Sequence, residues 1–262
     1  MRDSGLKGKI ALVTGAAGGI GAAVVHQLAD EGVRVIATDR DEAGVRALAG
    51  GFDARHGHHV EAVPLDLRSS AAVDGVVERI EREIGPIDLL AHVAGVLSYA
   101  PVVGLSDDEW ERVLDINATG VFRVGRAVAR VMQPRRRGAM VVVSSNAAGV
   151  PRHAMAAYAA SKAAATMFTR CLGLELAPHG IRCNIVAPGS TLTPMQTGMW
   201  ADANGAAAVI AGTPELFKAG IPLAKLATPD DVADAVLYLL SERAGHVTMA
   251  DLYVDGGATL RG

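Results

Sequence analysis

Short, almost continuously apolar runs rich in β-branched residues alternate along this chain with longer stretches rich in Ala, Leu and Val. Strands that are apolar on both faces are typical of a parallel sheet covered by helices on each side. The sequence therefore predicts an α/β fold with a doubly wound parallel sheet and helices on both faces. The expected strands are 10–14, 34–39, 60–65, 89–93, 139–144, 182–187 and 251–254, of which the first six are the near-continuous apolar runs.

Helical segments are expected between these strands, at 19–31, 69–84, 109–132, 155–178 and 232–241. Ser69 can cap the second helix, and Pro134 is expected to break the third. The last begins with Thr228 as its N-cap, Pro229 in the first helical position and two carboxylates at the positive end of the helix dipole.

The region 189–221 is irregular, because Gly, Pro, Thr and Ala interrupt every pattern in it. At about thirty residues it exceeds the roughly 12–15 residues usual for a structureless loop, which predicts a lid-like functional region. Within residues 1–262 there is no linker, repeat or low-complexity tract, so one domain is expected.

Composition narrows the class of protein. Half of the residues are hydrophobic and the net charge is -3, which argues against nucleic acid or an anionic membrane surface as the main partner. No apolar run reaches the roughly 18 residues of a membrane span, and the first residues lack the apolar core of a signal peptide. Cys171 and Cys183 have no CxxC spacing, and the histidines at 56–59 have no carboxylate or Cys beside them. A cytoplasmic protein without a metal site or disulfide is expected.

A glycine-rich turn follows the first expected strand directly. Gly15, Gly19 and Gly21 have the spacing that permits a tight turn, close approach of backbone amides to a pyrophosphate, and close packing of the next helix. Asp39 ends the second strand, where a carboxylate can hold both ribose hydroxyls of NAD and repel a 2′-phosphate. The sequence therefore predicts NAD rather than NADP, with Arg40 as the one residue that speaks against it.

Asp66 follows the third strand, which Leu67 extends. A carboxylate at this edge of the sheet can accept a hydrogen bond from the adenine amino group. It can equally cap the helix that starts near Ser69. Both interpretations stay open.

Tyr158 and Lys162 lie four residues apart and therefore on one face of a helix. A phenol has an ordinary pKa of about 10, and a nearby ammonium is expected to lower it. Tyr158 can then take a proton from a substrate alcohol while hydride leaves carbon. Ser145 ends the fifth strand and can hold the reacting oxygen, and Asn117 is suited to ordering a water beside Lys162. Taken singly, each residue is equally compatible with a structural role.

These residues, together with Ala94-Gly95 and Pro188-Gly189, occur in the order and spacing of the short-chain dehydrogenase/reductases, and the chain resembles that family from about residue 8 onward. The resemblance implies a Rossmann-like sheet of about seven strands and a homotetramer that uses the helices 109–132 and 155–178. It implies a catalytic tetrad of Asn117, Ser145, Tyr158 and Lys162, in which Lys162 also holds the nicotinamide ribose. The expected cofactor-binding residues are Gly15, Gly19, Ile20, Gly21, Asp39, Asp66, Leu67, Ala94, Gly95, Tyr158, Lys162, Pro188, Gly189 and Thr191. His92 stands where the family usually has Asn, so altered local hydrogen bonding with retained catalysis is expected.

The stretches around and after Tyr158 resemble one subgroup of the family, the dehydrogenases of 2,3-dihydro-2,3-dihydroxybenzoate in catechol siderophore biosynthesis. The matching stretches are Pro151-Arg152-(x)2-Met155-(x)2-Tyr158, Gly173-Leu174-Glu175-Leu176, Ile181-Arg182-Cys183-Asn184, Pro188-Gly189-Ser190-Thr191, Met195-Gln196 with Trp200, Phe217-Lys218-(x)-Gly220-Ile221-Pro222-Leu223 and Val254-Asp255-Gly256-Gly257-(x)-Thr259-Leu260. The resemblance implies NAD-dependent oxidation of the C3 hydroxyl of a small carboxylated cyclohexadiene.

The residues themselves agree with an anionic ring. Arg152, six residues before Tyr158, can clamp a carboxylate bidentately, although it can also be an ordinary surface arginine. Methionines and a tryptophan can wall a flat ring or simply pack the lid on the core. The expected substrate-binding residues are Arg152, Met155, Asn146, Gln196, Met195 and Trp200.

Three alternatives stay open. The first is oxidation of 2,3-dihydro-3-hydroxyanthranilate, which has an amine at C2 that Asn146 can face. The second is a generic NAD(P)-dependent secondary-alcohol or 3-oxoacyl reductase, against which the lack of a basic residue in the glycine turn speaks. The third is a non-catalytic NAD-binding protein, against which the tetrad speaks.

Overall fold

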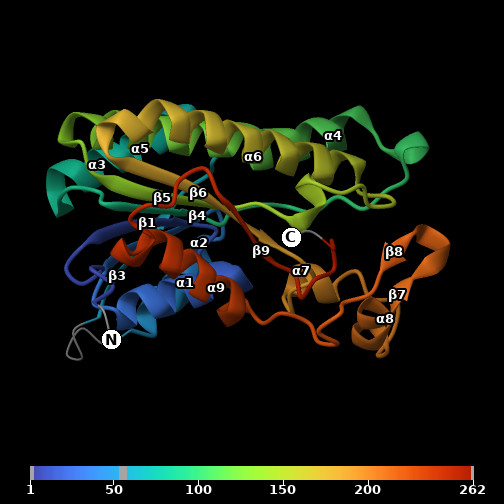
Figure 1. Ribbon diagram of the computed structural model, residues 1–262. Helices are drawn as coiled ribbons and strands as arrows, with labels where there is room; N and C mark the ends of the chain where they lie inside the picture. The colour runs from blue at the N-terminus through green and yellow to red at the C-terminus, as the bar shows by residue number, and fades with distance from the viewer. Residues whose placement is uncertain (1–2, 53–57, 261–262) are drawn as a thin grey trace.

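The computed structural model describes residues 3–52 and 58–260 (Figure 1). Within them, seven parallel strands form one sheet in the order β3-β2-β1-β4-β5-β6-β9. The strands are β1 Ile10–Thr14, β2 Arg34–Asp39, β3 His59–Pro64, β4 Leu89–His92, β5 Gly138–Val143, β6 Ile181–Pro188 and β9 Asp251–Val254. The predicted α/β class and parallel sheet are confirmed, and each expected strand is present with its ends shifted by at most one residue.

The strand order reverses at the centre of the sheet. From β1 the chain moves outward through β2 to β3, and it then returns to β4 on the other side of β1 and continues to β9. Thr14, at the end of β1, therefore pairs with Thr38 on one side and His92 on the other. A parallel sheet binds ligands in the crevice outside the carboxyl ends of its strands at such a reversal.

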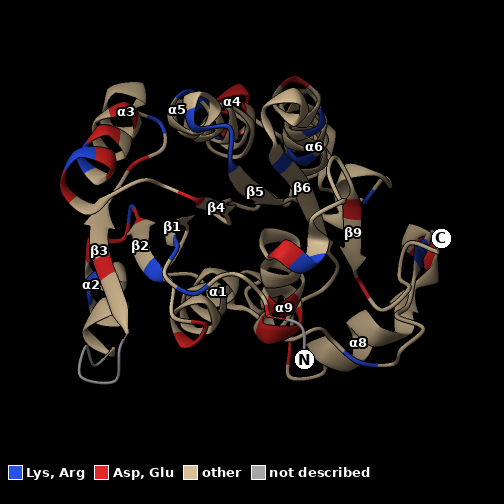
Figure 2. Cartoon of the chain, turned by 60° about the vertical axis from the view of Figure 1, so that its left-hand side comes forward, with Lys and Arg blue, Asp and Glu red and all other residues tan. Residues whose placement is uncertain are grey.

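Helices cover both faces of the sheet (Figure 1). The helices on one face are α1 Gly19–Asp30, α2 Glu42–Gly50 and α9 Pro229–Leu240, and those on the other are α3 Ser70–Arg79, α4 Asp107–Leu114, α5 Gly120–Arg135 and α6 Ala156–Leu176. The central strands β1, β4 and β5 carry no Lys, Arg, Asp or Glu, as Figure 2 shows. Their side chains are therefore free to pack against both layers.

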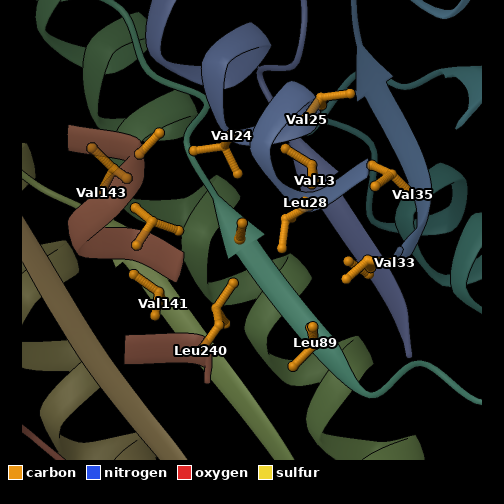
Figure 3. Close-up of a cluster of buried hydrophobic side chains, with 14 of the residues drawn as sticks. Val13, Val24, Val25, Leu28, Val33, Val35, Leu89, Val141, Val143 and Leu240 are labelled. Atoms are coloured by element: carbon orange, nitrogen blue, oxygen red, sulfur yellow. The ribbon is translucent and has the colours of Figure 1, made fainter. Parts of the chain in front are cut away.

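The core beneath α1 and α9 is built mainly from branched aliphatic side chains (Figure 3). Val24 and Leu28 of α1 and Leu240 of α9 are buried with Val13 and Val141 of the sheet. Burying one such side chain contributes roughly 1.5–3 kcal/mol. This packing holds the N-terminus of α1 directly after β1.

Two of the predicted helices are interrupted. The segment predicted as one helix at 109–132 consists of α4, a π-helical turn Asp115–Thr119 and α5, and α3 continues into a second π-helical turn, Ile80–Ile84. Pro134 does not break α5 but lies in its last turn, so only the hydrogen bonding at the end of the helix is affected. The helix ends instead at Arg135, before a left-handed residue, Arg136.

Two further features differ from the prediction. β3 lies at the edge of the sheet, so Val63 is its one fully buried residue rather than part of a strand covered on both faces. The sequence patterns missed α2, a short helix whose N-cap Asp41 accepts a hydrogen bond from the N–H of Gly44.

The irregular region 189–221 contains short elements beside the carboxyl edge of the sheet (Figure 1). They are α7 Pro194–Thr197, α8 Gly205–Ala211 and an antiparallel hairpin of β7 Gly212–Thr213 and β8 Lys218–Ala219. Among the helices of residues 3–52 and 58–260, none has the length and apolar character needed to cross a membrane.

Candidate active site

At two positions, Gly15 and Gly21, the turn after β1 leaves no room for a side chain. Gly15 has φ +69°, and a Cβ on it would lie 2.5 Å from the Cα of Ala94. A Cβ on Gly21 would lie 2.0 Å from the carbonyl oxygen of Gly15. No side chain caps the N-terminus of α1, so its first N–H groups point outward without partners from the helix. This arrangement fits the phosphates of a dinucleotide.

A cavity of about 280 Å³ lies over this turn. Nine of the predicted cofactor-binding residues line it: Gly15, Gly19, Ile20, Gly21, Asp39, Asp66, Leu67, Ala94 and Gly95. The carboxylate of Asp39 accepts the N–H groups of Ala17 at 3.1 Å and Asp41 at 3.0 Å. Since each oxygen holds a single N–H, both retain capacity to accept hydroxyl groups.

Asp66 lines the same cavity but is paired. Arg68 donates to it through Nε at 3.0 Å and Nη2 at 2.6 Å, and this pairing holds the pKa of Asp66 below its ordinary value. Asp66 does not cap the following helix. Ser69 caps α3 instead, because its hydroxyl accepts a hydrogen bond from the N–H of Ala72. Arg68, which the sequence reasoning did not weigh, also lines the cavity.

A second cavity, of about 360 Å³, lies beyond the ends of β5 and β6. Ser145 follows β5, and Tyr158 and Lys162 lie one turn apart on α6; all three line this cavity. The hydroxyls of Ser145 and Tyr158 are hydrogen-bonded to each other. The Ser145 hydroxyl also accepts the N–H of Ala147 at 3.1 Å, which fixes its position.

The two cavities are adjacent. They share Ile20, Val93, Gly95, Thr193 and Met195 in their walls. A Cβ on Gly95 would lie 3.1 Å from Nζ of Lys162, so the ammonium lies at the junction. A dinucleotide on the glycine turn can therefore reach the Ser145–Tyr158 pair.

The pKa of Tyr158 is raised above its ordinary value, because its burial outweighs the hydrogen bond from Ser145. The predicted lowering by Lys162 is wrong for the ligand-free protein. Nζ of Lys162 lies 5.9 Å from the centre of the Tyr158 ring and donates to the carbonyl of Val143 at 2.9 Å. Burial lowers the pKa of Lys162 itself to about 8.

Asn117 lies in the π-helical turn between α4 and α5 and is fully buried. Its Oδ1 accepts the N–H of Val96 at 2.8 Å, and its Nδ2 donates to the carbonyl of Val96 at 2.8 Å and to Ser161 at 3.0 Å. Asn117 lines neither cavity. Both amide hydrogens of Asn117 are already donated. This side chain could therefore bind a water beside Lys162 only by accepting a hydrogen bond at the remaining lone pair of Oδ1.

His92, at the end of β4, is buried behind this cluster. Its Nδ1 is hydrogen-bonded to the hydroxyl of Thr14 at 3.0 Å, and its Nε2 has no partner among the described residues. Burial above all, and then the charge of Lys162, lowers the pKa of His92 to about 3. The imidazole is therefore neutral at physiological pH.

The remaining predicted residues gather at the second cavity. Its walls include Arg152, Met155, Asn146, Gln196, Met195, Trp200, Pro188, Gly189 and Thr191. The guanidinium of Arg152 is half-buried and has no hydrogen-bond partner among the described residues. Burial lowers the pKa of Arg152, while the carboxylate of Asp255 acts in the opposite direction. A cation placed in this way favours an anionic ligand.

Sequence reasoning missed Lys218, which lines the same cavity from β8. The sequence did contain a signal for it, because Lys218 lies in the stretch Phe217-Lys218-(x)-Gly220 that resembles the subgroup, but no role follows for the lysine from that stretch alone. Among the described residues, no group of three or more His, Cys, Asp or Glu is placed to hold a metal ion, and His56 lies outside those residues.

Comparison with known proteins places this geometry in context. A family model described as enoyl-(acyl carrier protein) reductase matches residues 15–259. The chain is 57% identical to the 2,3-dihydro-2,3-dihydroxybenzoate dehydrogenase of Bacillus subtilis (strain 168), over 99% of each chain. It is 42% identical, again over 99% of each, to the vibriobactin-specific 2,3-dihydro-2,3-dihydroxybenzoate dehydrogenase of Vibrio cholerae serotype O1.

A solved structure has the same architecture over the full length of both chains. It is a gluconate 5-dehydrogenase from Burkholderia cenocepacia J2315 in complex with NADP and tartrate, with a TM-score of 0.90 and 29% identity. The match covers 100% of each chain. That protein binds a phosphorylated dinucleotide together with a small dicarboxylate.

Proposed function

The chain belongs to the short-chain dehydrogenase/reductase family, and from this premise we propose that it oxidises 2,3-dihydro-2,3-dihydroxybenzoate to 2,3-dihydroxybenzoate with NAD. The observation that carries the substrate assignment is the unpaired guanidinium of Arg152 in the cavity of the Ser145–Tyr158 pair. A carboxylated cyclic diol presents both a hydroxyl for the pair and an anion for the arginine. Two relatives that span the whole chain carry the name of this activity, so the C2-amino alternative and a generic reductase are not favoured.

The family binds NAD or NADP, and the choice of NAD is part of the proposal. The carboxylate of Asp39 lies in the cofactor cavity, where it can accept ribose hydroxyls and would repel a 2′-phosphate. Arg40 and Arg68 line the same cavity, but Arg68 is already paired with Asp66. These contacts support NAD over NADP.

We assign the chemical roles as follows. Tyr158 accepts the proton of the C3 hydroxyl, Ser145 holds the reacting oxygen, and Lys162 lies where it can contact the nicotinamide ribose. NAD, when bound, accepts the hydride from C3. The ketone formed at C3 then tautomerises: the proton at C2 is lost and the C3 oxygen gains one, which gives the catechol, and aromatisation makes the oxidation effectively irreversible.

Asn117 acts as a positioning residue in this proposal. Its hydrogen bonds join Val96, which follows β4, to Ser161, which directly precedes Lys162 on α6. It therefore holds the catalytic face of α6 against the cofactor cavity.

Because Tyr158 has a raised pKa in the free protein, it is a neutral phenol until substrate and cofactor bind.

A homotetramer and a cytoplasmic location complete the proposal. The outer faces of α5 and α6 expose Phe122, Met167 and Leu174, which suits contact with other copies of the chain. NAD-linked oxidation draws on the cytoplasmic pool of the coenzyme. The product is a catechol of the kind that siderophores use to bind iron.

The direct test is absorbance at 340 nm with the purified protein, the dihydrodiol acid and either NAD or NADP. Rapid NADH formation and release of 2,3-dihydroxybenzoate are expected, with NAD at least about tenfold better than NADP in kcat/KM. The C2-amino analogue, 2,3-dihydro-3-hydroxyanthranilate, is assayed in parallel. A higher kcat/KM for the amine would overturn the C2 assignment, and no turnover of either acid would overturn the function.

A further inference from the structure

Two cations from separate parts of the chain line the second cavity. Arg152 lies in the connection between β5 and α6, and Lys218 lies in β8. Both side chains are half-buried, and neither takes part in an ion pair or side-chain hydrogen bond within the described residues. Burying part of a cation without a partner costs free energy, so such a pair needs a reason.

Among residues 3–52 and 58–260, no carboxylate forms an ion pair with either cation. Asp255 is the carboxylate that acts on Arg152, but its oxygens already accept hydrogen bonds from Gly257 at 2.9 Å, from Thr259 at 3.1 and 2.8 Å, and from Asn146 at 3.4 Å. Burial, and then the positive charge of Arg152, lowers the pKa of Lys218. The two cations therefore act on each other, and neither has a direct ion-pair partner within the described residues.

The hairpin that carries Lys218 is fixed at its base. Gly212 has φ +87°, and Lys218 pairs with Thr213 across the two strands. A Cβ on Gly220 would lie 2.3 Å from the carbonyl oxygen of Ile210, so β8 leaves the hairpin in close contact with the end of α8. Thr213 and Lys218 both line the cavity, so the strand pairing itself places Lys218 in the wall.

We propose that Lys218 is the second half of the carboxylate subsite, so that the substrate anion lies between Arg152 on one wall and Lys218 on the hairpin. This inference rests on the proposed function and names the residue that determines its acid specificity. An anion that bridges both walls is favoured by two charges at once, whereas a neutral diol meets two unneutralised cations. The subsite thus selects acids, because a carboxylate is attracted by both cations and a neutral ring by neither.

The test is equilibrium binding, measured by titration calorimetry in the presence of NAD. The probes are 2,3-dihydroxybenzoate and catechol, which differ only in the carboxylate. In Lys218→Met we expect the Kd of the acid to rise about tenfold or more, as befits loss of one charge-assisted contact. The Kd of catechol should change less than about twofold. Lys218→Arg, which keeps the charge, should recover most of the affinity for the acid.

Lys225→Met is the matched control, because Lys225 is an exposed lysine outside both cavities. It should leave both dissociation constants unchanged. Equal weakening of acid and catechol in Lys218→Met would show that Lys218 only packs the hairpin, and an unchanged Kd for the acid would remove Lys218 from the subsite.

The wild-type oxidation assay keeps this inference apart from the proposed function. If the wild type oxidises the dihydrodiol acid but Lys218→Met binds 2,3-dihydroxybenzoate normally, the inference alone fails. If the wild type does not oxidise the acid, yet binds 2,3-dihydroxybenzoate in a Lys218-dependent way, the function fails and the anion subsite stands.

Discussion

The hydroxyl of Tyr158 is the group through which the reacting proton has to pass, and it is hydrogen-bonded to the hydroxyl of Ser145. Tyr158→Phe removes that hydroxyl and keeps the ring. We expect kcat to fall by about 10²–10⁴-fold, the usual contribution of a positioned acid or base. The Kd of NADH, measured by its fluorescence, should change less than about threefold, because the glycine turn is untouched. Activity above about a tenth of the wild type would show that another group takes the proton.

His92 makes the stability of the protein sensitive to acid. Its pKa is lowered from 6.5 to about 3 in the folded chain, so the unfolded chain binds a proton at acidic pH that the folded chain refuses. The stability that neutral His92 provides is complete above pH 6.5 and is lost as pH falls toward 3. At about pH 4.5 the loss amounts to roughly 2–3 kcal/mol.

His92→Asn should abolish this loss and keep dehydrogenase activity, because Asn does not titrate and is the residue usual in the family. Urea unfolding of both proteins at neutral pH and at about pH 4.5 measures the difference. If the free energy of unfolding falls equally in the wild type and the variant, His92 is not the acid-sensitive group.

Which residues gather at the two cavities was largely predictable, but their pairings were not. The residues of the glycine turn and the Tyr–Lys pair follow from chemistry that requires those side chains at that spacing. The pairing of Asp66 with Arg68 and the meeting of Lys218 with Arg152 depend on where whole segments come to lie. The raised pKa of Tyr158 likewise follows from burial, which spacing along a helix does not report.

At the scale of elements, the close packing of α1 on β1 holds the cofactor cavity open. Gly21→Ala would bring a Cβ to 2.0 Å from the oxygen and 2.7 Å from the carbon of the Gly15 carbonyl. Because these are backbone atoms, α1 must move away, and we expect the Kd of NADH to rise at least about tenfold. Stability should fall by roughly 1–3 kcal/mol, as for overpacking in a core.

Gly18→Ala is the control for this change, since its Cβ would meet only the Gly15 carbonyl oxygen at 3.4 Å. Fluorescence titration with NADH and thermal unfolding compare the two variants. Similar behaviour of both would show that the turn tolerates side chains and that the steric argument fails.

Strands of the sheet were predictable to within one residue at their ends, whereas helix ends differed by up to three residues, as at the start of α9 and the end of α5. The interruption between α4 and α5 was not predictable from the sequence. Asn117 in the π-helical turn is hydrogen-bonded to Val96 and Ser161, which are distant from it in sequence. The short elements of region 189–221 were missed for a related reason. Each is too short to show a periodicity, so tertiary contact decides its conformation.

At the scale of the whole molecule, α6 presents an apolar stripe that this chain leaves uncovered. Met167 and Leu174, seven residues apart and therefore on one face, are 54% and 66% exposed. On the neighbouring α5, Phe122 is 39% exposed and stacks edge-on against Phe168. Both helices lie on the outer layer of the molecule (Figure 1). Exposed apolar side chains gathered in this way favour contact with other copies of the chain.

We therefore expect the wild type to elute, in size-exclusion chromatography with light scattering, at about four times its chain mass of 27.0 kDa. Met167→Glu combined with Leu174→Glu should shift the mass to that of a dimer or monomer, because burying two carboxylates in an apolar contact is costly. Leu223→Glu, which changes an exposed leucine outside α5 and α6, should leave the mass unchanged. A wild-type monomer would refute the tetramer, and an unchanged mass in the double variant would place its contacts elsewhere. Since α6 also carries Tyr158 and Lys162, dissociation should lower kcat, which ties assembly to the order of the catalytic helix.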